Sequence, residues 1–171
     1  MTAAGPAPVI VTALLGDRDF AWADDLRRRH FPPERNHLAA HLTLFHHLPP
    51  SLLPELTGRL VAATRGVAAP AARYTGPMSL GRGVALRIDS PGLAAIHAEL
   101  ANAFAGLLTP QDQAGWRAHV TVQNKVTPAE AKALLARLEA ECPPRPIAIA
   151  GLAAYHYRGG PWELIRCFSF A

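Results

Sequence analysis

Two short segments of the chain carry the same pattern of a histidine, an aliphatic residue, a threonine and a second aliphatic residue. The first occupies residues 41–44, at the start of HLTLFHHL, and the second occupies residues 119–122, at the start of HVTVQNKV. Successive side chains of a β-strand point to opposite faces. Each pattern therefore predicts a strand with one apolar face for a core and one histidine/threonine face for a shared site.

The segments around these two strands repeat one order of elements. Residues 8–15 are apolar and β-branched, which is typical of a buried strand, and residues 17–30 have helical spacing that ends in a run of three arginines. Ser51, Ser90-Pro91 and Thr127-Pro128 are predicted helix starts. Hairpins are predicted over 72–88 and 147–170. The order strand, helix, histidine strand, helix occurs twice, so we expect one bilobal domain over residues 1–171.

Composition indicates the charge of possible partners and the cellular location but does not identify the activity. Lys plus Arg exceed Asp plus Glu by 17 to 13, which suits an anionic partner such as RNA or a phosphorylated small molecule, although many proteins carry this charge without one. Cys142 and Cys167 are too few for a disulfide framework and lack metal-ligand spacing, so a cytoplasmic location is expected. The apolar N-terminal run is interpreted as a strand, not a signal peptide, and no run predicts a membrane span.

The two histidines suit acid–base chemistry at phosphorus. Histidine titrates near neutrality, so one imidazole can take a proton from water while the other gives one to a leaving oxygen. Phosphodiester cleavage needs these two roles on opposite sides of the phosphorus, and His41 and His119 would supply one to each side. The hydroxyls of Thr43 and Thr121, on the same faces, can donate to phosphate oxygens. This scheme requires no metal and no cofactor.

The paired tetrapeptides resemble those of the two-histidine (2H) phosphoesterase superfamily. The nearest resemblance is to its bacterial 2′,5′-RNA ligase (LigT-like) branch of RNA 2′,3′-cyclic phosphodiesterases, with further support from the terminal YHYRGGPWELIRCF segment. The resemblance implies an α+β fold with pseudo-twofold symmetry, in which two mostly antiparallel sheets face a central cleft and the helices lie outside. It also implies that His41 is the general acid and His119 the general base. Ala40 and Ala118 stand where relatives often have proline.

Substrates implied by the resemblance are RNA ends with 2′,3′-cyclic phosphates or small cyclic nucleotides, with Thr43 and Thr121 holding the phosphate. The same acid–base pair could run the reverse reaction and join RNA ends through a 2′,5′ linkage. A non-catalytic nucleotide- or RNA-binding module on the same fold is the contrasting possibility. Nothing in the sequence indicates a membrane or an obligate protein partner.

Other residues near the motifs are weaker candidates for the site. Phe45 either stacks on a base or belongs to the core. Arg117 and Gln123 flank the second motif and are predicted to reach phosphate or ribose. Tyr155 and Tyr157 of the terminal hairpin either line the cleft or pack. His46 and His47 are assigned structural or peripheral roles, and no metal site is expected because neighbouring strand residues point apart without a cysteine or acidic ligand nearby.

Overall fold

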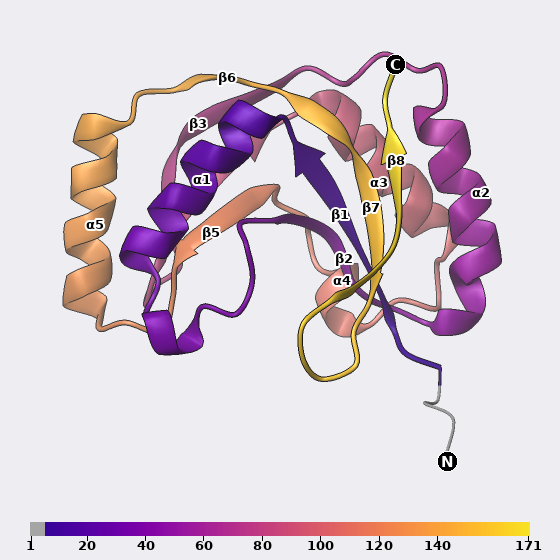
Figure 1. The fold of residues 1–171 in the computed structure, drawn as a ribbon, viewed down its shortest axis with the longest axis horizontal. Coiled ribbons are helices and arrows are strands. Elements are labelled where there is room, and N and C mark those ends of the chain that lie inside the picture. Colours follow the sequence, from indigo (N-terminus) through magenta and orange to yellow (C-terminus); the bar gives the residue numbers. More distant parts are fainter. Residues whose placement is uncertain (1–5) are drawn as a thin grey trace.

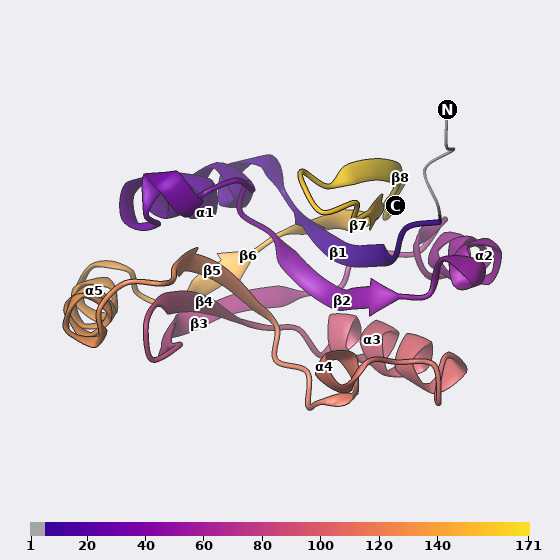
Figure 2. The same cartoon turned by 90° about the horizontal axis from the view of Figure 1, so that it is seen from below.

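The computed structural model describes residues 6–171 and places its strands in two antiparallel four-stranded sheets (Figures 1 and 2). One sheet has the order β2-β1-β7-β8 and the other the order β5-β4-β3-β6. The elements along the chain are β1 (Val9–Leu15), α1 (Asp17–His30), β2 (Leu42–Leu48), α2 (Leu53–Thr64), β3 (Ala72–Ser79), β4 (Val84–Asp89), α3 (Pro91–Ala103), α4 (Pro110–Gln113), β5 (His119–Gln123), α5 (Pro128–Glu141), β6 (Arg145–Ile147), β7 (Ile149–His156) and β8 (Glu163–Ser169). The predicted α+β class is confirmed.

Local signals account for several helix starts. Ser90 caps α3 by accepting from the backbone N–H of Leu93, and Thr127 caps α5 by accepting from that of Glu130. Each cap is followed by proline at the first helical position, as predicted. The predicted cap at Ser51 is wrong, because a short 3-10 turn over Pro50–Leu52 precedes α2 and no side chain caps it.

The helices pack against the two sheets, and one helix contacts a different sheet from the strand that it follows. Helix α1 follows β1 of the first sheet, yet it packs against β5 of the second. Helix α5 packs against β3 and β4, while α2 packs against β7 and β8 and contacts α3 at the opposite end of the molecule (Figure 1). Because α1 follows a strand of the first sheet and packs against a strand of the second, it links the two sheets. None of the helices within residues 6–171 has the length and hydrophobicity needed to cross a membrane.

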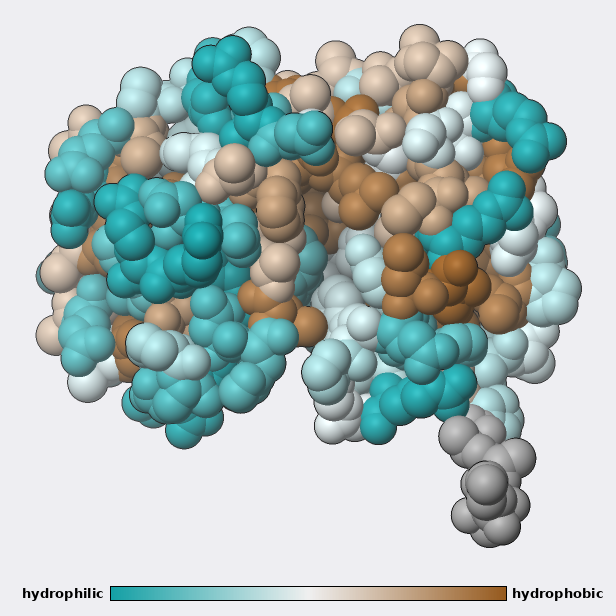
Figure 3. Space-filling model, viewed as in Figure 1, coloured by the Kyte–Doolittle hydropathy of each residue, from teal (hydrophilic) through white to brown (hydrophobic). Residues whose placement is uncertain are grey.

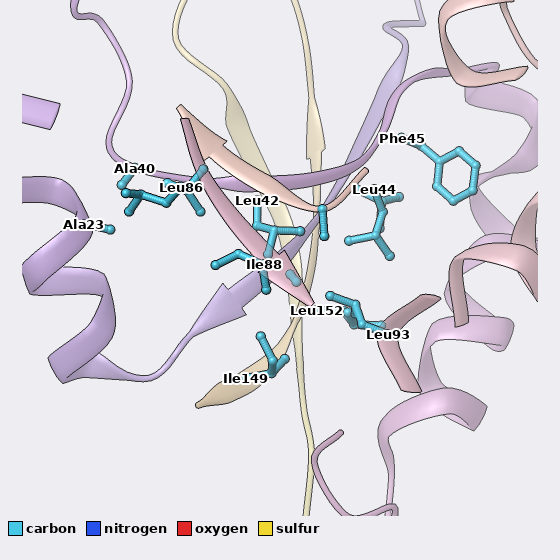
Figure 4. Packing of buried hydrophobic residues seen from close by; sticks show 14 of the residues in the cluster. Ala23, Ala40, Leu42, Leu44, Phe45, Leu86, Ile88, Leu93, Ile149 and Leu152 are labelled. Atoms are coloured by element: carbon cyan, nitrogen blue, oxygen red, sulfur yellow. The ribbon is translucent and has the colours of Figure 1, made fainter. Parts of the chain in front are cut away.

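The two histidine strands lie at the edges of different sheets and contact each other (Figure 2). A single apolar cluster runs between the sheets, with Leu42 and Leu44 of β2, Leu86 of β4 and Leu152 of β7 among its fully or almost fully buried members (Figure 4). The aliphatic residues of both tetrapeptides are buried in this cluster. The predicted apolar faces are therefore confirmed, and they bring the two histidine/threonine faces to one region.

Strand β2 departs from strict alternation after its first three residues. Its pairing with β1 shifts register twice, so Leu44 and Phe45 are both buried whereas His46 and His47 are both exposed. The ring of Phe45 is fully buried and stacks on His97 of α3, with 4.6 Å between ring centroids. Of the two alternatives for Phe45, stacking on a base is contradicted by this burial, and the structure has it as a core residue.

Candidate active site

Both motif histidines are held in the same way by the backbone before them. His41 immediately precedes β2, and His119 is the first residue of β5. The Nδ1 atom of His41 lies 2.8 Å from the carbonyl oxygen of Ala39, and that of His119 lies 2.7 Å from the carbonyl oxygen of Arg117. A carbonyl only accepts, so each Nδ1 carries the hydrogen. In the neutral rings Nε2 is then the basic nitrogen, as acid–base work at a substrate requires.

The backbone at both motif threonines is also held alike, by a donor from elsewhere in the chain. The indole Nε1 of Trp116 donates to the carbonyl of Thr43 at 2.9 Å, and the guanidinium of Arg27 donates to the carbonyl of Thr121 at 3.0 Å. Arg27 also donates to Asn36 at 2.8 Å and is buried. Of the three arginines at the end of α1, Arg27 is therefore not a solvated surface side chain but supports the backbone of the second histidine strand.

The environment of His41 favours its neutral form. Burial lowers the pKa of His41 below its ordinary value of 6.5, and the charges of Arg27, His46 and His119 lower it further, while the hydrogen bond to Ala39 opposes them. Once protonated, His41 is therefore a stronger proton donor than a free imidazole.

A cleft of about 570 Å³ opens beside His41. Its walls come from the end of β1, the start of α1, the segment before β2 and the β7–β8 hairpin, and Figure 3 shows the surface hollowed between the half with α1 and the half with this hairpin. Trp162 packs edge-on to the ring of His41 at 4.8 Å between centroids and lies 5.6 Å from Tyr155. Tyr155 lines the cleft, whereas Tyr157 is exposed and lies outside its lining.

A second cavity of about 230 Å³ opens beside Thr43 and His119. Arg117 lines it and is exposed, which is compatible with its predicted contact to phosphate or ribose. Gln123 is buried, with no hydrogen-bond partner for its Oε1 among the described residues, and it lines neither cavity. Its burial contradicts the predicted substrate contact. The reason is that Gln123 lies where β5 shifts register against β4, which ends the alternation of the motif.

Sequence reasoning missed Trp162, although the proline and glycines before it marked a loop that could carry a site residue.

The described residues do not form a metal centre. Within residues 6–171 no group of three or more His, Cys, Asp or Glu side chains is placed to hold a metal ion. The candidate active site thus consists of His41, Thr43, His119 and an aromatic wall, whereas Thr121, predicted to hold the phosphate, is partly buried and lines neither cavity.

Comparison with known families decides the affiliation. Residues 15–161 match the model of the 2'-5' RNA ligase superfamily. The chain belongs to this superfamily. The resemblance to 2H phosphoesterases drawn from the two tetrapeptides is thereby confirmed. No curated protein matches the chain significantly.

Solved structures share the fold of this 2'-5' RNA ligase superfamily member. The structure of TT0787 from Thermus thermophilus has a TM-score of 0.67 at 16% identity, over 95% of this chain and 97% of that one. A structure described as a phosphoesterase has a TM-score of 0.57 at 19% identity, over 97% and 99%. E. coli LigT complexed with 3'-AMP has a TM-score of 0.56 at 19% identity, over 98% and 99%. At these identities the likeness establishes the fold alone.

Proposed function

We propose that this protein is a metal-independent phosphodiesterase that hydrolyses 2′,3′-cyclic phosphate ends of RNA or small cyclic nucleotides. The observation that carries the proposal is the matched hydrogen bonding of the two histidines. His41 and His119 each donate from Nδ1 to a backbone carbonyl, and the strands β2 and β5 that carry the two motifs contact each other. One substrate can therefore meet Nε2 of both imidazoles, one in its neutral form to take a proton and the other in its protonated form to give one.

In the proposed reaction His119 takes a proton from water while the water oxygen attacks phosphorus. The bond from phosphorus to the 3′ oxygen breaks, and His41 gives that oxygen its proton, so the product is a 2′-phosphate. A proton passes from His119 to His41 through solvent to restore both rings. Thr43 and Thr121 donate hydroxyl hydrogens to the phosphate oxygens, where negative charge builds up. The assignment of acid and base follows the family, and the lowered pKa of His41 makes it an effective donor once protonated.

The cleft beside His41 is suited to a nucleoside. Trp162 and Tyr155 give it aromatic walls, and an aromatic ring binds a base by stacking without demanding one sequence. E. coli LigT, which shares the fold, has been crystallised with 3'-AMP, NADP+ and ATP, all of which are adenine nucleotides. The excess of basic over acidic residues favours such anionic ligands. A cytoplasmic location is part of the proposal and agrees with two free cysteines.

Ligation of RNA ends is the second candidate, because the description of the family names it. It is the reverse of a cleavage that uses the same two histidines, so both directions share one transition state. We place hydrolysis first because water is always present at the site in great excess over RNA ends.

The test is turnover of the four 2′,3′-cyclic mononucleotides and of a short RNA that ends in a 2′,3′-cyclic phosphate. Protein dialysed against EDTA is expected to hydrolyse them at the same rate as untreated protein, with 2′-phosphates as the products by chromatography. Release of 3′-phosphates would contradict the assigned bond cleavage. Complete absence of turnover with all five substrates would overturn the proposal.

A further inference from the structure

The second cavity contains a histidine that the proposed reaction does not use. His46 of β2 lines this cavity together with Thr43 and His119, and its side chain is 41% exposed. Behind it lies Asp112 of α4, whose side chain is only 1% exposed. The sequence indicated no link between these residues, because 66 positions separate them.

Asp112 holds His46 by both its backbone and its ring. One carboxylate oxygen lies 2.8 Å from the backbone N of His46 and 3.1 Å from its Nδ1, and the other lies 2.9 Å from the backbone N of His47. Burial alone would raise the pKa of Asp112, but hydrogen bonds from the ring and backbone of His46 and from the backbone of His47 outweigh it and lower this pKa below 3.8. The carboxylate is ionised at neutral pH, so Nδ1 of His46 carries its hydrogen, and in the protonated ring Nε2–H is free to donate to a ligand.

Hydrogen-bond donors dominate the polar lining of this cavity. Arg117 and Gln111 contribute N–H groups, His46 contributes one at Nε2 when its ring is protonated, and Arg117 forms no ion pair with any residue between 6 and 171. The only carboxylate in the lining is that of Asp112, which already accepts three hydrogen bonds. A cavity with free donors, two of them cationic or able to become so, and an acceptor already engaged suits an anion.

His46 lies farther along β2 than Thr43, which is proposed to hold the phosphate that reacts. It is three residues after Thr43 along β2, a separation of about 10 Å in a strand. A phosphate between the two motifs therefore leaves the far part of the cavity unfilled. The next anionic group of the same nucleotide is a phosphate at the 5′ position of its ribose, and this group can fill that part of the cavity.

We propose that His46, positioned by Asp112, and Arg117 bind a second phosphate of the substrate, distinct from the phosphate that reacts. The inference deepens the proposed function and rests on it. It specifies the substrate class: a nucleotide with a further phosphate at its 5′ position, as every terminal nucleotide of an RNA chain has, is preferred to a nucleoside that carries the 2′,3′-cyclic phosphate alone.

Equilibrium binding tests the second phosphate site without requiring catalysis. The probes are adenosine 2′-monophosphate and adenosine 2′,5′-bisphosphate, titrated by calorimetry at one fixed salt concentration. Wild-type protein is expected to bind the bisphosphate at least tenfold more tightly, the ratio that one charge-assisted hydrogen bond supplies. His46→Ala is expected to lower this ratio about tenfold, and His46→Gln, which keeps an N–H donor, to lower it less.

His47→Ala is the matched control. His47 is the next residue, is also exposed and also donates its backbone N–H to Asp112, but its side chain lies outside the lining of the cavity. Its replacement is expected to leave the ratio unchanged, which separates a local contact from a general effect of charge. Equal ratios in His46→Ala and wild type, or equal affinities of wild type for both probes, would overturn the second phosphate site alone. Failure of wild type to bind either probe would overturn it together with the nucleotide substrate class.

Discussion

Asp112→Ala is expected to lower the free energy of unfolding by about 3 kcal/mol. The carboxylate accepts from the backbone N–H groups of His46 and His47 at 2.8 and 2.9 Å, where β2 shifts its register against β1. Hydrogen bonds to a charged group contribute about 1.5–3 kcal/mol each. We take the lower end for these two because both histidines are exposed and water can replace the lost acceptor. The hydrogen bond with the ring of His46 adds little, since that side chain is 41% exposed.

Urea denaturation of wild type, Asp112→Ala and Asp112→Asn measures this loss. Asparagine keeps one acceptor oxygen, so its loss should be about half that of alanine. The pKa of Asp112 is lowered by folding, which means that its contribution is fully present above the ordinary pKa of 3.8 and disappears as pH falls through the lower folded value. The gap between wild type and Asp112→Ala should therefore be constant at neutral pH and shrink in strong acid. A loss under about 0.5 kcal/mol at neutral pH, the range of an ordinary surface substitution, would refute the reasoning.

Three further predictions concern the core, the cleft and pH. Because the ring of Phe45 is buried, Phe45→Ala should lower the free energy of unfolding by about 3–5 kcal/mol and Phe45→Leu by much less, measured by urea denaturation. A changed KM at unchanged stability would instead support the alternative in which Phe45 stacks on a base. Trp162→Ala should raise KM about tenfold with little change in melting temperature, and an unchanged KM would exclude the cleft as the nucleoside site. Burial lowers the pKa values of His41 and His97 below 6.5, so at mildly acidic pH the unfolded chain binds more protons than the folded chain. The free energy of unfolding should therefore fall as the pH drops below 6.5. Urea midpoints that do not change with pH would contradict this.

Local sequence patterns predicted much of the fold. Alternation located both histidine strands, and the caps at Ser90 and Thr127 located two helix starts, because each signal lies within a few residues of the element that it defines. The terminal hairpin was predicted in the same way and is present as β7 and β8. The helix α4 and the strand β6 have four and three residues and are too short to show periodicity.

The features that sequence reasoning missed depend on contacts between distant segments. The sequence around Arg27 indicates only the end of an amphipathic helix, yet its partner Thr121 lies 94 positions away. Asp112 reaches His46 across 66 positions and stabilises the register shift that buries Phe45 and exposes the two histidines after it. Alternation assumes a regular strand, so no pattern within β2 could reveal this shift.

The central claim is that His41 and His119 act as one acid–base pair. The most direct measurement is kcat/KM for a 2′,3′-cyclic mononucleotide with His41→Asn, His119→Asn, the double variant and His47→Asn as control, with circular dichroism to verify folding. Each catalytic variant is expected to lose about 100- to 10,000-fold, and the double variant little more than the worse single one, because the two groups act in one step. The control should match wild type. A folded His41→Asn or His119→Asn protein with activity within about tenfold of wild type would contradict the account.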